Sequence, residues 1–296
     1  SMVDGKTMID GKTMVCGLIG GPMEHTLSPV IHNTLARENG KNLVYVPFHV
    51  KGEQVGDAVR GAHALSIRGL NVTVPHKTAV IPYLNSVERE AALIGAVNTL
   101  VPEGEGYRGY NTDLSGLGRA LESDDVRLEG ERVILLGAGG VARTAAFLCA
   151  MRGAQEVWLL NRTLSRAQEL AEEVNRAAGR ACVKPLTLSD WKQIPEGRYL
   201  VLQGTMVGLA PDTERAPIED EGFYRLIHTG YDLIYRPART KFMRLVEEAG
   251  GRAFNGLKML LYQGVEAYEL WTRTTVTKEQ AALCYERMKK ELFADE

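Results

Sequence analysis

The chain has 296 residues, of which 45% are hydrophobic and 24% are charged, and its formal net charge is -2. This balance is typical of a soluble globular protein, and it disfavours nucleic acid or an anionic membrane as a partner, because binders of polyanions normally carry a basic excess. No apolar run approaches the ~18 residues needed to span a bilayer. The first 15 residues lack the basic and then apolar layout of a signal peptide, so we expect a cytoplasmic protein.

The length allows two domains. Metal binding is not expected, because the histidines have no partners at ligand spacing. The cysteines are also far apart in the chain, which disfavours a metal or redox role and favours small buried side chains. They are Cys16, Cys149, Cys182 and Cys284.

Short apolar runs alternate with longer segments of helical period, which predicts an α/β fold with sheets covered by helices. In the first part of the chain we expect strands over residues 15–20, 44–50 and 70–74. The segment SPVIHNTLAREN predicts a helix with Ser28 as its N-cap and Pro29 at its first position. Residues 96–113 are expected to form a hairpin whose turn is EGEG.

A second unit begins near Arg132 and reads strand, glycine turn, helix, strand, helix. Later strands are expected over 199–205 and 228–235, followed by a helix that glycine ends near residue 250. The tail, 257–292, has two helical stretches without a strand between them. Such a tail could return to the first unit and make that domain discontinuous.

The glycine turn GAGGVA, residues 137–142, matches the dinucleotide-binding fingerprint G-x-G-x-x-G/A. Gly137 would form the tight turn, Gly139 would let the pyrophosphate approach the backbone, and Ala142 would pack the helix on the strand. The turn follows a strand and opens a helix, whose N-terminal amides suit a phosphate. The alternative is a tight turn without a ligand.

The next strand ends in Asn161, Arg162 and Thr163, and Arg166 follows. An NAD site usually has a carboxylate here to bind the ribose hydroxyl. A carboxylate would repel a 2'-phosphate, whereas guanidinium groups can bind it with charge-assisted hydrogen bonds. The sequence therefore predicts NADP, the alternative being that both arginines are solvated surface charges.

Amides, hydroxyls and charges gather at predicted strand ends and turns of the first unit. Because ligands of open sheets bind outside the carboxyl ends of the strands, these groups could converge on one crevice for a small polyhydroxylated molecule. Each also has a structural reading, as a helix cap, a turn residue or a solvated strand end. The clusters are His25, Thr26 and Ser28; Asn71, Thr73 and Lys77; Asn98 and Thr99; and Asn111, Thr112 and Asp113.

These motifs together resemble the shikimate dehydrogenase family, from about Val15 to Trp271. The family's SxSP corresponds to HTLSP, its NVTxPxK to NVTVPHK, its GAxNT to GAVNT and its GxNTD to GYNTD. GAGGVAR, NRTLSR, DLIYRP and NGLKMLLYQ follow in the family's order. The resemblance implies a mixed α/β substrate domain (1–116 and 257–296) and a Rossmann-type NADP domain (117–256), with the C-terminal helices returning to the first.

The same resemblance implies NADP-linked interconversion of 3-dehydroshikimate and shikimate, in the pathway to chorismate and the aromatic amino acids, by a monomer or homodimer. Lys77 and Asp113 would be the catalytic pair. The implied substrate ligands are Thr26 and Ser28 for the carboxylate, Asn98, Thr73 and Gln263 for the hydroxyls, and Tyr235. The implied cofactor residues are Gly137, Ala138, Gly139, Gly140, Val141, Ala142, Asn161, Arg162, Thr163, Arg166, Thr205, Gly256 and Met259.

Two positions depart from the family's pattern. Thr26 replaces a serine and adds a methyl group, which crowds the carboxylate site and could alter the preference between shikimate and quinate. Gln203 replaces an asparagine, so its contact near the cofactor is open. A broader quinate/shikimate dehydrogenase is therefore an alternative function. A noncatalytic dinucleotide sensor is another, but a sensor has no chemical need for Lys77 and Asp113.

Overall fold

The computed structural model describes residues 2–3, 6–7 and 9–294. The prediction of no signal peptide concerns a segment of which positions 1, 4, 5 and 8 lie outside the described residues. The chain divides by its internal contacts into two compact units. The first unit is Ser1–Gly116 with Leu261–Glu296, and the second unit is Leu117–Leu260. Both boundaries fall inside helices, α4 (Thr112–Ser123) and α9 (Leu257–Thr272).

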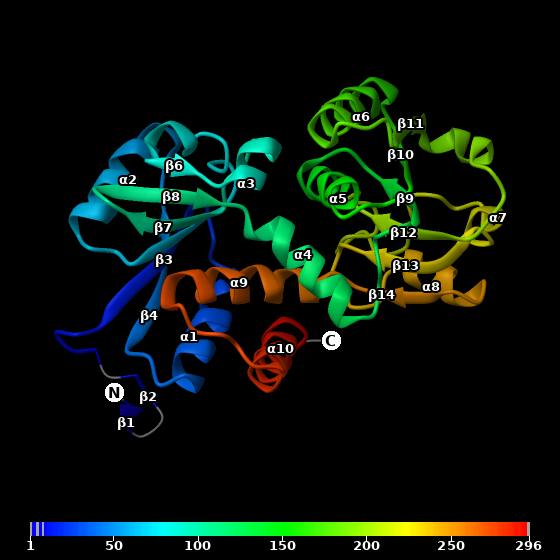
Figure 1. Ribbon diagram of the computed structural model, residues 1–296. Coiled ribbons are helices and arrows are strands. Elements are labelled where there is room, and N and C mark those ends of the chain that lie inside the picture. The colour runs from blue at the N-terminus through cyan, green and yellow to red at the C-terminus, as the bar shows by residue number, and fades with distance from the viewer. Residues whose placement is uncertain (1, 4–5, 8, 295–296) are drawn as a thin grey trace. The chain divides into compact units, whose positions relative to one another are not determined.

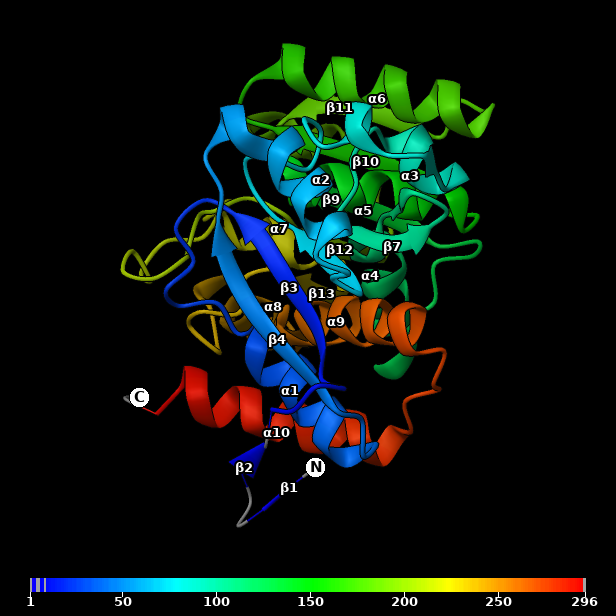
Figure 2. The ribbon, with the colours of Figure 1, turned by 90° about the vertical axis from the view of Figure 1, so that its left-hand side faces the viewer.

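A six-stranded mixed sheet forms the centre of the first unit, in the order β4-β3-β5-β7-β8-β6. β3 is parallel to β4 and β5, and the two long strands β3 and β4 run side by side in Figure 2. β7 is antiparallel to β5 and to β8, so the carboxyl ends of β3, β5 and β8 share one edge with the start of β7. The bounds are β1 Met2–Val3, β2 Lys6–Thr7, β3 Met14–Gly20, β4 Leu43–His49, β5 Gly69–Val72, β6 Ser86–Val87, β7 Thr99–Glu103 and β8 Gly106–Tyr110.

The predicted strand over 70–74 ends at Val72, so Thr73 and Val74 lie in the following loop. The predicted hairpin is confirmed, with Glu103 opposite Gly106. The helical segments of this unit, apart from α4 and α9, are α1 Ser28–Glu38, η1 Gly52–Gln54, α2 Val55–Ala64, η2 Ile81–Tyr83, α3 Arg89–Ile94 and α10 Lys278–Leu292.

The predicted N-cap of α1 is wrong. The helix already includes Ser28, and Leu27 holds the cap position without a side-chain hydrogen bond. The Thr26 hydroxyl accepts a hydrogen bond from the Ser28 backbone N–H at 3.2 Å. Because this upstream hydroxyl satisfies a helix-terminal amide, capping does not engage the Ser28 side chain.

The C-terminal helices return to the first unit. The Trp271 indole of α9 is buried and donates a hydrogen bond to the Leu100 carbonyl at 2.9 Å. Gly69 of β5 makes room for it, since a Cβ there would lie 2.2 Å from the indole nitrogen. Figure 1 shows α10 beside α1, where Gln280 donates to Asn39.

The second unit has a six-stranded parallel sheet in the order β11-β10-β9-β12-β13-β14. This is the order of a doubly wound Rossmann sheet, in which the order of the strands reverses between β9 and β12 while all strands stay parallel. The strands are β9 Arg132–Leu136, β10 Glu156–Asn161, β11 Val183–Thr187, β12 Tyr199–Gln203, β13 Ile227–Asp232 and β14 Arg252–Phe254. The helical segments are α5 Gly140–Met151, α6 Leu164–Ala178, η3 Leu188–Gln193, α7 Glu221–Tyr224 and α8 Lys241–Glu248.

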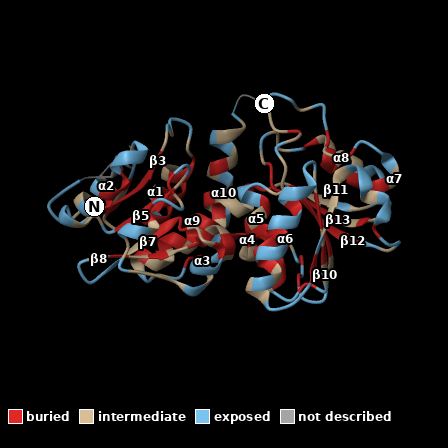
Figure 3. Ribbon diagram, turned by 90° about the horizontal axis from the view of Figure 1, so that it is seen from above, coloured by how far each residue is buried: buried red, intermediate tan, exposed pale blue. Residues whose placement is uncertain are grey.

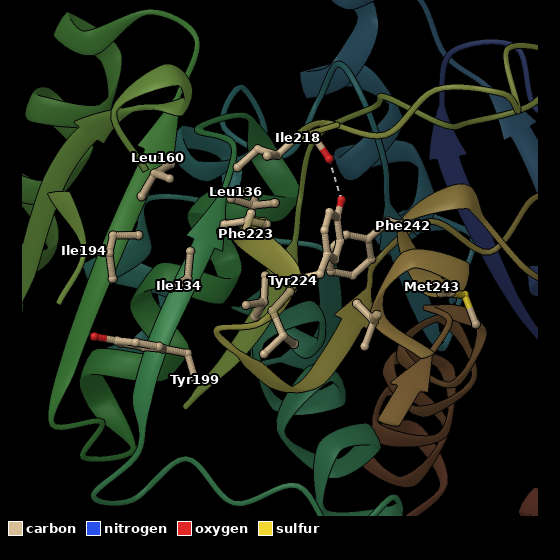
Figure 4. Packing of buried hydrophobic residues seen from close by; sticks show 13 residues of the cluster. Ile134, Leu136, Leu160, Ile194, Tyr199, Ile218, Phe223, Tyr224, Phe242 and Met243 are labelled. Carbon is tan, nitrogen blue, oxygen red and sulfur yellow. Dashed lines mark hydrogen bonds between the residues drawn. The ribbon is translucent and has the colours of Figure 1, made fainter. Parts of the chain in front are cut away.

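Apolar side chains bury both faces of this sheet, and Figure 3 colours most of β12 and β13 as buried. In the hydrophobic cluster of Figure 4, the buried Tyr224 hydroxyl donates a hydrogen bond to the Ile218 carbonyl at 2.6 Å. The predicted strands over 199–205 and 228–235 end earlier, at Gln203 and Asp232, so Thr205 and Tyr235 belong to loops. Among the described residues, no helix is long and apolar enough to cross a membrane.

Candidate active site

The edge of the first sheet carries a lysine and a carboxylate in direct contact. Lys77 follows β5, and its Nζ donates to Asp113 Oδ2 at 2.7 Å. Asp113 lies in the first turn of α4, where the helix dipole favours a negative charge. The two side chains are 33% and 19% exposed, so the pair is shielded from water yet reachable.

A hydrogen-bonded cluster of amides and hydroxyls lies beside this pair. Asn98 Oδ1 accepts from the Thr112 backbone N–H at 2.6 Å, and Asn98 Nδ2 donates to Thr112 Oγ1 at 3.0 Å. Thr99 Oγ1 also donates to Asn98 Oδ1. The β7 start and the α4 start are thereby fixed to each other.

Asn71 extends the cluster toward α1. Its Nδ2 donates to Thr99 Oγ1 at 3.1 Å, and its Oδ1 accepts from the buried Tyr45 hydroxyl at 2.9 Å. Tyr45 was not predicted as a site residue, because it lies inside β4 and belongs to no recognisable polar motif. Burial raises the pKa of Tyr45 above its usual value and the Ser28 hydroxyl opposes that shift, so Ser28 belongs to the same polar surroundings.

The remaining predicted substrate residues have different positions. Thr73 lies against Gly20 at the end of β3, where a Cβ on Gly20 would come within 2.3 Å of the Thr73 methyl. Gln263 is buried on α9, and Gly116 of α4 lets the two helices approach, since a Cβ there would lie 2.6 Å from the Gln263 nitrogen. Tyr235 belongs to the second unit.

His32 is buried next to this cluster, stacked on the Tyr45 ring at 4.3 Å and 4.9 Å from the Trp271 ring. Neither ring nitrogen has a hydrogen-bond partner in the part of the chain that the structure describes. Burial lowers the pKa of His32 to about 3, and the nearby Asn71 side chain opposes the shift only partly. The imidazole is therefore neutral in the folded protein.

We expect this histidine to make the protein sensitive to acid. Below pH ~6.5 the unfolded imidazole binds a proton and the folded one does not, so stability falls by about 1.4 kcal/mol per pH unit until the pH approaches 3. His32→Phe should remove this part of the pH dependence. Urea unfolding of both proteins at pH 7 and pH 5 measures it, and identical losses in the two proteins would contradict the assignment.

The second unit presents the glycine turn at the end of β9. Gly137 has φ of +107°, and a Cβ on it would meet the Gly204 carbonyl oxygen at 2.8 Å, so the turn requires glycine. α5 begins at Gly140 with Gly139 as an N-cap that has no side chain. Apart from the adjacent backbone, no atom of the described residues lies within 4 Å of the Cβ positions of Gly139 and Gly140, which leaves the helix amides open to a phosphate.

Exposed basic and polar side chains follow the neighbouring strand. Arg162, Thr163 and Arg166 are exposed at the start of α6, and the Asn161 amide holds the turn by donating to the Thr163 carbonyl at 3.0 Å. β10 is parallel to β9, so these residues share the edge with the glycine turn. Thr163 caps α6 without a side-chain hydrogen bond, so its hydroxyl and the helix amides can face an anion.

The other predicted cofactor residues lie at the same edge of the second unit, on two loops and at the start of α9. Gly256 donates its N–H to the Ile234 carbonyl at 3.0 Å and leaves no room for a side chain, since a Cβ would lie 2.3 Å from the Leu233 carbonyl oxygen. Met259 is half-buried in the first turn of α9. The Thr205 hydroxyl is engaged inside its own loop, with Gln203.

Comparisons with known proteins cover most of the chain. The shikimate dehydrogenase substrate-binding domain matches residues 18–100, the shikimate/quinate 5-dehydrogenase family matches 120–194, and the shikimate 5'-dehydrogenase C-terminal domain matches 256–272. A shikimate dehydrogenase (NADP(+)) of Methanothermobacter thermautotrophicus is 43% identical over 285 residues, which are 92% of this chain and 93% of the relative. The chain belongs to the shikimate dehydrogenase family.

Solved structures of shikimate dehydrogenases have the same fold. One in complex with NADP+ has a TM-score of 0.86 at 33% identity and covers 97% of this chain and 98% of its own. One from Listeria monocytogenes, in complex with shikimate and NAD, has a TM-score of 0.86 at 30% identity, with 94% and 97% covered. The α/β fold with a Rossmann-type sheet is thereby confirmed for this member of the shikimate dehydrogenase family.

Proposed function

We propose that the protein catalyses the NADP-linked, reversible reduction of 3-dehydroshikimate to shikimate, acting in the cytoplasm as a monomer or homodimer. The observation that carries the proposal is the contact of Lys77 Nζ with Asp113 Oδ2 at 2.7 Å, beside the amide and hydroxyl cluster. In such a pair the lysine can donate or accept one proton next to groups that bind the hydroxyls of a substrate. Membership of the shikimate dehydrogenase family supports this reaction.

The substrate would lie over the edge of the first sheet. Thr26 and Ser28 hold its carboxylate with their hydroxyls, at the start of α1, where the helix dipole favours an anion. Thr73, Asn98 and Gln263 bind the ring hydroxyls, and Tyr235 supplies a further contact to the substrate. The hydrogen bonds behind Asn98 keep its amide in one orientation, which favours a substrate with a hydroxyl at a fixed position.

The nicotinamide cofactor, when bound, supplies or accepts the hydride. In the reducing direction, Lys77 donates its proton to the oxygen that becomes the new hydroxyl, and the lysine is left neutral until solvent returns a proton. In the oxidising direction, neutral Lys77 takes the hydroxyl proton. Asp113 accepts a hydrogen bond from Lys77 Nζ, which holds the ammonium group in a fixed position.

NADP fits the residues of the second unit. The open positions at Gly139 and Gly140 accept a pyrophosphate, and Arg162 with Arg166 gives the 2'-phosphate two guanidinium groups. The proposed contacts also include Ala138 of the glycine turn, Val141 and Ala142 in the first turn of α5, Asn161 and Thr163 at the end of β10, the loop residues Thr205 and Gly256, and Met259 in the first turn of α9.

Arg162→Ala combined with Arg166→Ala is expected to raise the KM for NADP by about 10- to 100-fold, because charge-assisted hydrogen bonds contribute about 1.5–3 kcal/mol. The KM for NAD should stay nearly constant, since NAD has no 2'-phosphate. Arg176→Ala, at an exposed position in the last turn of the same helix, is the matched control. An unchanged NADP to NAD preference in the double variant would show that the arginines are only surface charges.

A quinate/shikimate dehydrogenase is the second candidate, since the family matched over 120–194 includes quinate 5-dehydrogenases and Thr26 adds a methyl group to the proposed carboxylate site. One assay tests both candidates. Purified protein is mixed with shikimate or quinate and with NADP or NAD, and absorbance of the reduced nicotinamide is followed. The proposal expects the highest kcat/KM for shikimate with NADP, and no reduction in any mixture would refute it.

A further inference from the structure

We propose that Gln203, anchored by Asp232, is a positioning residue that shapes the loop 204–207 for the nicotinamide end of the dinucleotide. The inference rests on the proposed function. Loop 204–207 follows β12, which lies next to β9 at the point where the strand order reverses. In such sheets a dinucleotide binds across this point, so a cofactor held by Arg162 and Arg166 beyond β10 and by the glycine turn after β9 would have its nicotinamide end near the loop after β12.

The Gln203 side chain is fully buried and bonds to the loop with both ends of its amide. Its Oε1 accepts from the Thr205 backbone N–H at 2.7 Å and from the Thr205 hydroxyl at 2.7 Å. Its Nε2 donates to the Val207 carbonyl at 3.3 Å and weakly to the Thr205 carbonyl. One side chain therefore replaces the strand partners that the backbone loses where β12 ends.

Asp232 holds the far side of this amide. Gln203 Nε2 lies 3.4 Å from Asp232 Oδ1, which also accepts from the Ile234 backbone N–H at 3.0 Å. Asp232 Oδ2 accepts from the Thr240 hydroxyl at 2.6 Å, and Thr240 is the N-cap of α8. The Gln203–Asp232 pair, called the bridge below, therefore connects the loop after β12 with the loop after β13 and with α8.

The shaped loop lies directly against the glycine turn. The Gly204 N–H donates to the Leu136 carbonyl at 2.7 Å. Gly204 also packs closely on Ala142, since a Cβ added to this glycine would lie 3.0 Å from the Ala142 Cβ. Met206 at the tip of the loop is 76% exposed, so a large apolar side chain is held outward at the cofactor edge. Any shift of the loop would move this surface relative to the pyrophosphate site.

The bridge requires at position 203 a side chain of the length of glutamine that both accepts and donates hydrogen bonds. A glutamate has the same shape but would set a carboxylate against the Val207 carbonyl and Asp232, where it has no hydrogen to donate unless it is protonated. A methionine fills the space but leaves Thr205 and Val207 without partners. Both variants should therefore displace the loop while the sheet beneath it keeps its packing.

The test measures binding of two probes to the purified full chain without substrate. Gln203→Glu should weaken NADPH binding, followed by nicotinamide fluorescence, by about tenfold. Binding of adenosine 2',5'-bisphosphate, which lacks the nicotinamide half, should stay within twofold of the native value. Gln193→Glu, the same change at an exposed site of the second unit, is the matched control and should alter neither.

Unchanged NADPH binding in Gln203→Glu would overturn the proposal, and equal weakening of both probes would overturn it in favour of a general structural role. Gln203→Met should give the same selective loss if the glutamate variant does not fold, and failure of both variants to fold would again indicate a structural role. A native chain that binds neither probe would instead refute the proposed function.

Discussion

Replacing Lys77 with alanine is expected to lower kcat by about 10²- to 10⁴-fold, the usual contribution of a well-placed proton donor. The substitution removes the only proposed proton donor and leaves the Asp113 carboxylate without its 2.7 Å partner. NADPH binding should be unaffected, because the proposed cofactor residues belong to the second unit. Steady-state kinetics with shikimate and NADP, together with NADPH titration, measure both parts.

Two variants control this experiment. Lys51→Ala removes an exposed lysine of the same unit and should have near-native kcat. Asp113→Asn keeps the shape of the partner but removes its charge, so kcat should fall by less than in Lys77→Ala. Near-normal turnover by a folded Lys77→Ala protein would exclude Lys77 as the proton donor.

Trp271→Ala is expected to lower the free energy of unfolding by about 3–5 kcal/mol, the range for truncation of a large buried aromatic side chain. The indole is 6% exposed, fills the space above Gly69 and satisfies the Leu100 carbonyl. Its loss leaves a cavity and removes the hydrogen bond to the Leu100 carbonyl in one step. Urea unfolding at neutral pH measures the change.

Trp271→Phe separates the two contributions, because phenylalanine keeps most of the volume and loses the N–H donor. Its loss of stability should be clearly smaller than that of Trp271→Ala. A loss below about 1 kcal/mol in the alanine variant would show that α9 contributes little to the first unit.

Local signals made much of the fold predictable from the sequence. The glycine turn at 137–142 combines strand, turn and helix within a few residues, and the EGEG hairpin does the same. β14 was missed because three residues are too short for a periodic signal, and β11 because Pro185 interrupts it. The cap of α1 was misassigned because Thr26 and Ser28 both carry hydroxyls, and only the backbone geometry distinguishes them.

The site was predictable where motif residues lie on neighbouring strand ends, and less so where partners come from distant segments. No local pattern shows that Tyr45 donates to Asn71, or that His32 lies between rings from β4 and α9. Gln203 illustrates the same limit, since its anchor Asp232 is 29 residues away. Such contacts follow from packing, which depends on the whole fold.

The chain leaves the first unit inside α4 and comes back inside α9, which has a consequence for synthesis on the ribosome. The second unit is continuous, so all its residues have been made before Leu261 is added. The first unit must wait for its last segment, which brings Gln263 and Trp271. Since domains generally fold as units, the second unit can fold first, and a nascent chain that stops at Leu260 would lack the segment that completes the first unit.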